Sequence, residues 1–310
     1  MPEPARVTVV MTAKGEPAER IERALASVTG QSYDGDVEIV VAAPPGEARP
    51  SVGRVVDNPS GARSAGLNLA VAAASGDVVV RLDARSLLPP DYIATCVTRL
   101  ADDARVGVVG GVQCATAASN DVVARGIARA LRNPWATGGA AYRRIGAKGE
   151  VDTVYLGVFR RADLLRVGGW DERLDANEDF DLCQRYRAAG MKVWLEHDVV
   201  VDYEARRHLA DVWRQYMAFG RSKVRFWRFT HSRPGKRQLG ALGAVAATAA
   251  TAVAFPVTIP AAAAGLVVLD HFADPHERDP RVRAVALVAY VPIVGGWTAG
   301  IVLEAMGLRR

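Results

Sequence analysis

Asp83 stands where an acidic side chain could bind a ligand, because it directly follows the strand-like run VVVRL at residues 78–82. In an open α/β sheet, ligands bind beside the carboxyl ends of the strands. A carboxylate at that edge can hold a divalent cation that bridges a nucleotide diphosphate. An aspartate that forms a turn or caps a helix would occupy the same kind of position. The residue alone leaves both interpretations open.

A second acidic group occurs in the segment NEDFDLC, where Glu178, Asp179 and Asp181 lie just before an amphipathic helical pattern. Neighbouring carboxylates raise one another's pKa, which suits a group that must accept a proton near neutral pH. The same acids, preceded by Asn177, would also cap a helix and complement its macrodipole. General-base chemistry and helix capping therefore both remain open from these residues.

Several common catalytic motifs are missing from the sequence. It has no GxGxxG after the first strand-like run, no P-loop and no GxSxG, which disfavours a Rossmann dehydrogenase, an NTPase and an α/β-hydrolase. The five histidines gather in the second half of the chain without metal-ligand spacing, so we expect surface or interfacial residues. They are His197, His208, His231, His271 and His276.

The cysteines and the N-terminus bear on the cellular compartment. Cys96, Cys114 and Cys183 are odd in number and show no CxxC spacing, which argues against a disulfide framework or a zinc site and favours a reducing compartment. The first residues lack a basic stretch followed by an apolar one, so we expect no cleaved signal peptide. The catalytic part is therefore expected on the cytoplasmic side.

Hydrophobic patterns predict the elements that must position these acids. Strand-like runs alternate with helical ones, which predicts an α/β fold with a mostly parallel sheet and helices on both faces. The expected strands cover 6–11, 37–41, 78–82, 106–112, 151–159, 192–195 and 199–203. The expected helices cover 17–29, 62–74 and 91–100, and a loop enters a further helix within 175–190.

The character of the sequence changes at residues 206–237, which hold ten Lys/Arg and one acid, Asp211. Apolar and aromatic residues recur on one helical face, and arginines occupy the other, a pattern typical of a helix lying in a membrane interface. The first set is Leu209, Val212, Trp213, Tyr216, Phe219 and Trp227, and the second is Arg207, Arg214, Arg221, Arg225 and Arg228.

Apolar segments of bilayer length follow this basic strip. Residues 239–269 carry no charge, and 282–303 carry only Arg283, so both are membrane candidates. We therefore expect anionic lipid, and not nucleic acid, as the partner of the basic strip, although a soluble Ala-rich hairpin remains possible. We further predict a helical hairpin turning around Phe255–Pro256, and a break near Pro292 or Gly295–Gly296 in the last segment.

The order of motifs resembles the family 2 glycosyltransferases, and specifically their succinoglycan-biosynthesis ExoA-like branch. The matching stretches span most of residues 57–228: DNPSGARSAGLNLAVAAASGDVVVRLDARSLLPPDYIATCV, VGGVQC, NPWATGGAAYRR, VDTVYLGVFRR, GGWDERLDANEDFDLCQRYRAAG and RQYMAFGRSKVRFWR. This resemblance implies a GT-A fold, a nucleotide-sugar donor, a divalent cation (Mg or Mn) and inversion at the anomeric carbon.

The resemblance also implies roles for individual residues. Asp83 matches the first acid of the metal-binding Asp-X-Asp motif, and Asp179 matches the catalytic base of the Glu-Asp motif. Glu16 matches the acid that approaches the nucleoside. Arg63 and Asn68 match a helix that borders the donor pocket.

The sequence departs from the family pattern in three places. Ala42 replaces the acid that recognises the nucleotide base, Lys14-Gly15 replaces the usual Tyr-Asn, and Arg85 stands at the third position of the metal motif. We predict that Arg85 partly replaces a metal ligand by offering positive charge to the donor diphosphate.

These observations predict three regions: a GT-A catalytic domain at 1–205, a basic amphipathic interfacial helix and linker at 206–237, and membrane-associated helices at 238–310. The expected activity is transfer of a sugar from a nucleotide-sugar donor to a lipid-linked saccharide in envelope or exopolysaccharide synthesis. The expected location is the cell membrane, with the catalytic domain in the cytoplasm. Two alternatives remain: a non-catalytic sugar-binding or scaffold subunit of a polysaccharide complex, and a polyprenyl-phosphate sugar synthase.

Overall fold

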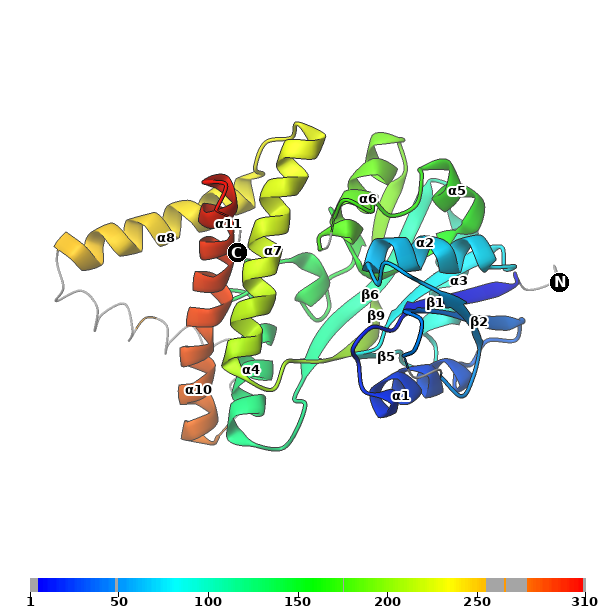
Figure 1. Ribbon diagram of the computed structural model, residues 1–310, viewed down its shortest axis with the longest axis horizontal. Helices are drawn as coiled ribbons and strands as arrows, with labels where there is room; N and C mark the ends of the chain where they lie inside the picture. Colours follow the sequence, from blue (N-terminus) through cyan, green and yellow to red (C-terminus); the bar gives the residue numbers. More distant parts are fainter. Residues whose placement is uncertain (1–4, 48–49, 175, 255–264, 266–277, 309–310) are drawn as a thin grey trace. The chain divides into compact units, whose positions relative to one another are not determined.

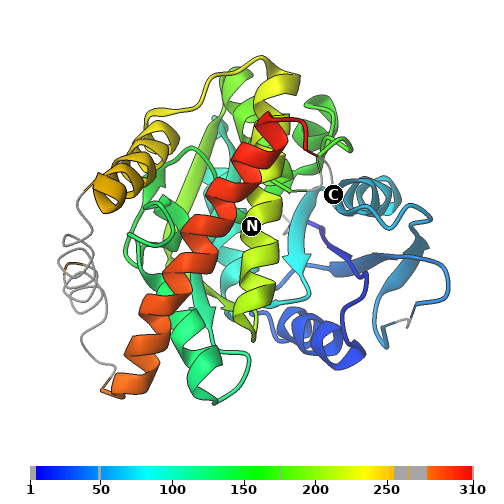
Figure 2. The same cartoon turned by 60° about the vertical axis from the view of Figure 1, so that its left-hand side comes forward.

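The computed structural model describes residues 5–47, 50–174, 176–254, 265 and 278–308 (Figure 1, and turned about the vertical axis in Figure 2). The chain forms two compact units, Met1–Cys114 with Ala141–Tyr203, and Ala115–Ala140 with Glu204–Arg310. The predicted hairpin turn at Phe255–Pro256 lies outside the described residues.

The first unit is built on a nine-stranded sheet. Its strands are β1 (Val7–Thr12), β2 (Val37–Ala43), β3 (Arg54–Asp57), β4 (Val78–Asp83), β5 (Ser86–Leu87), β6 (Val106–Thr116), β7 (Gly149–Glu150), β8 (Tyr155–Arg160) and β9 (Lys192–Glu204). Its helices are α1 (Ala18–Thr29), α2 (Arg63–Ala73), α3 (Tyr92–Asp102), a short 3-10 helix (Ala141–Arg143), α5 (Arg161–Arg166) and α6 (Glu178–Ala188).

The sheet is mixed, with the strand order β3-β2-β1-β4-β8-β6-β9-β5 and β7 paired to β9. Strands β3, β2, β1 and β4 are parallel to one another, whereas β8 runs antiparallel to both β4 and β6. The α/β class is confirmed, but the prediction of a mostly parallel sheet holds only for its first half. Local alternation of strands and helices does not reveal the direction in which a later strand inserts.

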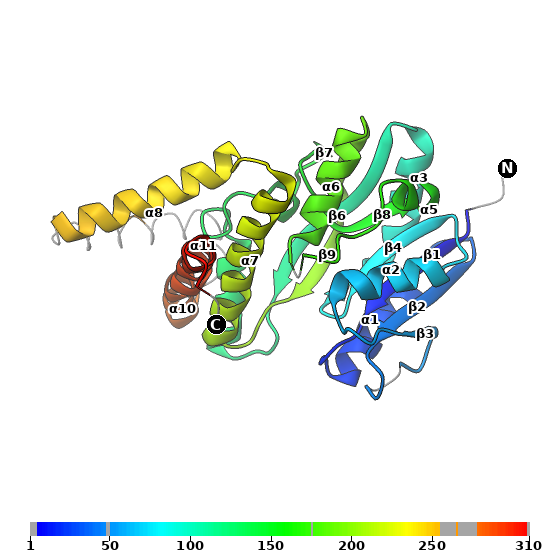
Figure 3. The same cartoon turned by 45° about the horizontal axis from the view of Figure 1, so that its top comes forward.

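Two hydrophobic cores lie on the two faces of this sheet, because successive side chains of a strand point to opposite faces. Val9 and Leu82 pack in one core with residues of α1 and α3. Val10 and Val79 pack in the other with residues of α2, α5 and α6. Figure 3 shows α2 and α6 along one face and α1 along the other. Helices on both faces therefore surround the strand ends that carry Asp83.

Three of the expected strands differ from the structure. The runs 192–195 and 199–203 are one continuous strand, β9, and the strand expected at 151–159 begins only at Tyr155. The polar residues Glu196, His197 and Asp198 obscured the continuity of β9, because an interruption of the apolar pattern predicts a turn.

The second unit is helical. Its helices are α4 (Val122–Arg132), α7 (Leu209–Thr230), α8 (Lys236–Ala254), α10 (Pro280–Tyr290) and α11 (Gly296–Ala305), with a π-helical segment at Val291–Gly295 between the last two. The helix therefore continues through the predicted break, and a π turn accommodates Pro292, which lacks an N–H to donate. Among the described residues, Pro280–Ala305 is the one helix long and apolar enough to cross a membrane, and its most apolar stretch is 44% buried.

Glycines let α11 approach α7 closely. A Cβ added at Gly300 would lie 2.2 Å from the carbonyl oxygen of Met217, and one at Gly220 would lie 2.1 Å from that of Trp297. Small residues at such crossings allow backbones to touch, in membranes as in soluble bundles. Figure 2 shows the long helix that ends in α11 crossing α7.

The arginines of α7 have partners inside this unit. Arg225 pairs with Glu304 at 3.1 Å, and Arg228 donates to the carbonyl oxygens of Glu304 and Ala305 at 3.1 Å. Arg221 donates to the carbonyl oxygen of Leu308 at 3.4 Å. Cationic side chains are favourable at a helix C-terminus. This part of the predicted lipid-facing stripe therefore also holds the end of α11.

Candidate functional site

The candidate site lies within the first unit, where Asp83 ends β4. Asp83 is in register with Thr12 at the end of the parallel strand β1. It is therefore at the carboxyl edge of the parallel strands, the position at which open α/β sheets bind ligands.

A buried arginine, Arg81, forms hydrogen bonds with both predicted acids. Its side chain is 1% exposed. Nε and Nη2 donate to the two carboxylate oxygens of Asp83 at 3.0 and 3.3 Å, and Nη2 also donates to Glu178 Oε1 at 3.1 Å. Nη1 donates to Asp179 Oδ1. One guanidinium thus joins the end of β4 to the start of α6, which brings together the predicted metal ligand and the predicted base.

Asp179 occupies the first turn of α6, which follows Asn177 in the left-handed region at φ 62°. The indole Nε1 of Trp170 donates to Asp179 Oδ1 at 3.0 Å. The Asp179 side chain is 25% exposed, although its surroundings are buried. Arg81 and Trp170 therefore hold its carboxylate on one side, while part of the side chain remains accessible to solvent.

The charges of this cluster are interdependent. Burial raises the pKa of the Asp179 carboxyl to about 6, Arg81 opposes that rise, and Glu178 and Asp83 add to it. Burial also acts to raise the pKa of Asp83, but Arg81 and Arg63 outweigh it and hold that pKa below its ordinary value. The pKa values of the two aspartates thereby move apart, so that Asp83 stays ionised and Asp179 can take up a proton near neutral pH.

This separation predicts an acid limb in the pH profile. Turnover should fall as the pH drops through about 6, because the protonated Asp179 cannot accept a proton from a substrate. A pH series of initial rates between about 5 and 8 measures this limb. A rate that stays flat down to about pH 4.5, with the protein still folded, would contradict the assignment.

Two of the other predicted site residues, Glu16 and Arg85, form an ion pair with each other. Glu16 accepts from Arg85 Nε at 3.1 Å and from Arg20 Nη1 at 2.6 Å. Arg63 lies 3.6 Å from Glu178 through its Nη1. Glu16 and Arg85 are therefore brought together, and Arg63 joins the Arg81 cluster at its edge.

Asn68 is engaged with the polypeptide chain itself. Its Nδ2 donates to the carbonyl oxygen of Trp170 at 2.9 Å, and its Oδ1 accepts from the Trp170 N–H at 2.9 Å. Nδ2 also donates to Glu172 Oε1 at 3.0 Å. The position of Asn68 beside a donor pocket stays a prediction. Its observed contacts hold the backbone of Trp170 in place, and Asn68 is called the clamp of Trp170 below.

Asp83 can offer a ligand to a divalent cation. Each of its oxygens accepts a bond from Arg81, which leaves lone pairs unused, and the side chain is 23% exposed. The third position of the motif is the cation Arg85, so further ligands would come from phosphate and water, as is common for Mg²⁺. The residues present fit an ion that arrives with a diphosphate.

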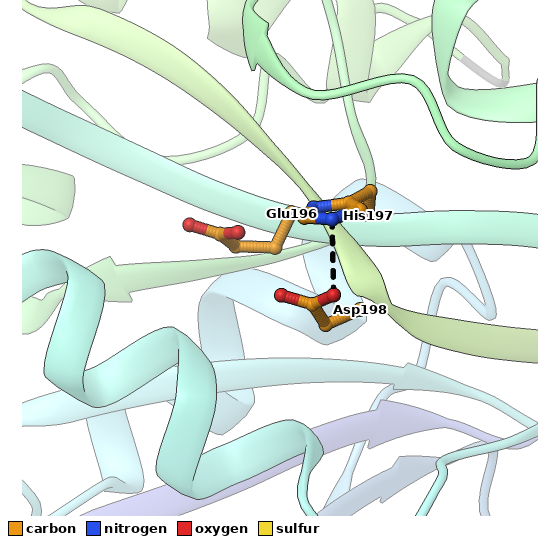
Figure 4. Close-up of side chains that lie close together, drawn as sticks. All are labelled: Glu196, His197 and Asp198. Carbon is orange, nitrogen blue, oxygen red and sulfur yellow. Dashed lines mark ion pairs between the residues drawn. The ribbon is translucent and has the colours of Figure 1, made fainter.

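Glu196, His197 and Asp198 form another cluster, on β9, whose ligand atoms lie within 4.8 Å of one another (Figure 4). His197 Nε2 lies 3.0 Å from Asp198 Oδ1. Glu196 is already neutralised by Arg99 at 2.5 Å and Lys148 at 3.3 Å. A metal ion would have to compete with these two cations, so the cluster is a weaker candidate than Asp83. No motif in the sequence marks this run as a metal site.

Sequence reasoning also missed Arg81 and Trp170, the residues that connect the site. A signal for Arg81 existed, since a charge within the apolar run VVVRL, two residues before Asp83, shares its face of the strand. Trp170 follows Gly168 and Gly169, and no local pattern predicts that its indole reaches an acid nine residues later.

Comparison with known proteins agrees with this geometry. The succinoglycan biosynthesis protein ExoA of Rhizobium meliloti (strain 1021) is 28% identical over 266 residues, which cover 82% of this chain and 78% of ExoA. The mannosyltransferase PcManGT from Pyrobaculum calidifontis, solved with GDP-Man and Mn²⁺, superposes with a TM-score of 0.59 at 21% identity. That match covers 100% of this chain and 90% of PcManGT, and it supports the GT-A fold.

A family model described as "Glycosyltransferase like family 2" matches residues 4–222, well over half of the chain. The matched region contains the Arg81 cluster, both predicted acids and the whole sheet. The resemblance predicted from the motifs is confirmed, and the chain belongs to the family 2 glycosyltransferases.

Proposed function

We propose that this enzyme transfers a sugar from a nucleotide-sugar donor to a lipid-linked saccharide, with inversion, in the synthesis of an envelope or exopolysaccharide. The observation that supports the proposal is that the single guanidinium of Arg81 donates hydrogen bonds to both Asp83 and Asp179. The likeness to ExoA supports the polysaccharide context.

The proposed reaction is a single displacement. Asp179 accepts the proton of the acceptor hydroxyl while the hydroxyl oxygen forms a bond to the anomeric carbon from the face opposite the leaving group. The bond between that carbon and the diphosphate oxygen breaks, and the nucleoside diphosphate leaves with the electron pair. One displacement inverts the configuration. A divalent cation held by Asp83 would supply positive charge to the leaving diphosphate.

The donor class and the cation are proposed by analogy with PcManGT, whose solved structure holds GDP-Man and Mn²⁺. The loss of the base-recognising acid at Ala42 leaves the nucleotide to be found by experiment. We would screen UDP- and GDP-sugars with the detergent-solubilised enzyme and follow nucleoside diphosphate release, with and without a polyprenyl-linked saccharide. Release that requires the acceptor, and a product of inverted anomeric configuration, supports the proposal.

Two outcomes of this screen would contradict it. Transfer to a bare polyprenyl phosphate alone would identify a polyprenyl-phosphate sugar synthase. No release with any donor, from enzyme that remains folded, would favour a sugar-binding or scaffold subunit instead.

Arg85 supports a prediction about metal dependence. Because Arg85 follows Asp83 by two residues and its guanidinium is held by Glu16, we expect it to bring positive charge to the diphosphate. Arg85→Ala should raise the donor KM by about tenfold, the loss of roughly one charge-assisted hydrogen bond. Chelation with EDTA should reduce activity without abolishing it in the wild type, and should abolish it in Arg85→Ala. Complete loss of wild-type activity in EDTA, together with an unchanged KM in the variant, would show that Arg85 does not contribute.

We propose a location at the cytoplasmic face of the cell membrane, with residues 1–205 as the catalytic region, 206–237 as the interfacial helix and 238–310 as the membrane-associated part. The support is the apolar helix Pro280–Ala305 together with the aromatic side chains of α7, of which Trp213 is 36% exposed. Since several α7 arginines pair with α11, attraction to anionic lipid is proposed for the remaining positive charge of 206–237.

A further inference from the structure

The site contains a feature that bears on which atom of Asp179 reacts. Two donors reach the same oxygen: Arg81 Nη1 and Trp170 Nε1 both donate to Oδ1. They approach from β4 and from the segment before α6, so a rotation of the carboxylate would break both bonds. Oδ2 is thereby held in one direction, with its lone pairs not used by either donor.

The position of the indole is itself fixed. Trp170 is 1% exposed, and its ring packs edge-on against Phe159 at 5.7 Å. Asn68 holds the Trp170 backbone by a pair of hydrogen bonds, both of 2.9 Å. Gly169 permits this approach, because its φ is +63° and an added Cβ would lie 2.5 Å from Asn68 Oδ1.

This arrangement is more specific than core packing requires. A phenylalanine would fill most of the space against Phe159, but it would offer no N–H to Asp179. The N–H also cannot be turned elsewhere, because the backbone clamp and the ring packing fix it. A base whose proton-accepting oxygen is aimed in advance avoids the loss of rate that follows small errors in orientation.

We infer that Trp170, clamped by Asn68, is a positioning residue that orients Asp179 so that Oδ2 is the atom that takes the proton from the acceptor hydroxyl. The inference rests on the proposed function, since it assumes that Asp179 is the base. The inference gives the Gly-Gly-Trp segment a role in the chemical step, and it gives Asn68 a role although Trp170 and Asp179 stand between Asn68 and the substrate.

The main test compares Trp170→Phe with the wild type. We expect kcat to fall by about 10- to 100-fold, as for loss of a hydrogen bond to a charged group, while the donor KM stays within about twofold. Replacing Trp170 by 3-benzothienylalanine, in which sulfur takes the place of the N–H, should give the same fall with the ring shape kept. This second variant answers the question even if the phenylalanine variant is too unstable to assay.

A matched control separates positioning from stability. Tyr186 packs on Phe159 at 5.8 Å within the same aromatic cluster. Tyr186→Leu should lower Tm at least as much as Trp170→Phe does, yet keep kcat within about threefold, because large-to-small core substitutions act mainly on folding. An equal loss of kcat in both variants would mean that Trp170 serves only packing.

A double-mutant cycle with Asp179→Asn completes the test. If Trp170 acts through Asp179, Trp170→Phe should cause no further loss in the Asp179→Asn background, measured with radiolabelled donor. Multiplicative losses, or wild-type kcat in the benzothienyl variant, would overturn the inference. The two failures remain distinguishable: full activity of Asp179→Asn refutes the proposed base, whereas an inactive Asp179→Asn beside a fully active benzothienyl variant refutes only the positioning role.

Discussion

Asp179→Asn should lower kcat by about two to four orders of magnitude, the usual contribution of a general base. The amide keeps the size of the side chain, and its oxygen can still accept from Arg81 and Trp170, so the fold should be retained. It cannot take up a proton, so the chemical step loses its acceptor. Donor binding, measured by calorimetry, should change little, because the predicted donor contacts lie on other residues.

Asp181→Asn provides the matched control for this prediction. Asp181 lies in the same first turn of α6, is buried, and pairs with Arg185 at 2.7 Å. Its substitution should reduce stability and leave turnover within a few-fold of the wild type. A normal rate in Asp179→Asn, or an equal loss in both variants, would show that the acids of this turn serve the helix and not the reaction.

Arg81→Met should be the most destabilising substitution considered, with a loss of about 3–5 kcal/mol in the free energy of unfolding. The variant leaves Asp83, Glu178 and Asp179 together at a buried site without their shared cation. Urea unfolding at pH 7 measures the loss. Arg105→Met is the control, since Arg105 is 73% exposed, solvent screens its pair with Asp103, and the urea unfolding curve should stay close to that of the wild type.

The loss of stability in Arg81→Met should depend on pH because of the same charges. Arg81 lowers the pKa of Asp179 and of Asp83, so both values should rise when it is removed. Protonation then relieves the repulsion, and the loss of stability relative to the wild type should shrink as the pH falls from about 8 to about 5. A loss of stability that is constant over this pH range would mean that the carboxylates pair with other groups in the variant.

The sequence by itself predicted the class of the fold and the identity of both acids. Alternating apolar runs are a local property, and the pleat of a strand or the turn of a helix follows directly from them. For this reason β1, α1, β2, α2 and β4 lie close to their predicted ranges. The acids Asp83 and Asp179 were found because each follows or begins such an element and because the order of motifs resembles a known family.

Tertiary structure alone decided how these parts meet. Strand β8 inserts antiparallel between β4 and β6 and so joins segments far apart in the chain. The spacing of apolar residues along the sequence does not predict such pairing. The same holds for the 98-residue separation between Arg81 and Asp179, and for the arginines of α7 that hold the end of α11. A side chain's type limits the bonds that it can make, but its partner is chosen by which elements the fold brings within reach. The proposed chemistry therefore depends on Asp83 and Asp179, which the sequence predicts, and on the orientation of their side chains, which follows from tertiary packing.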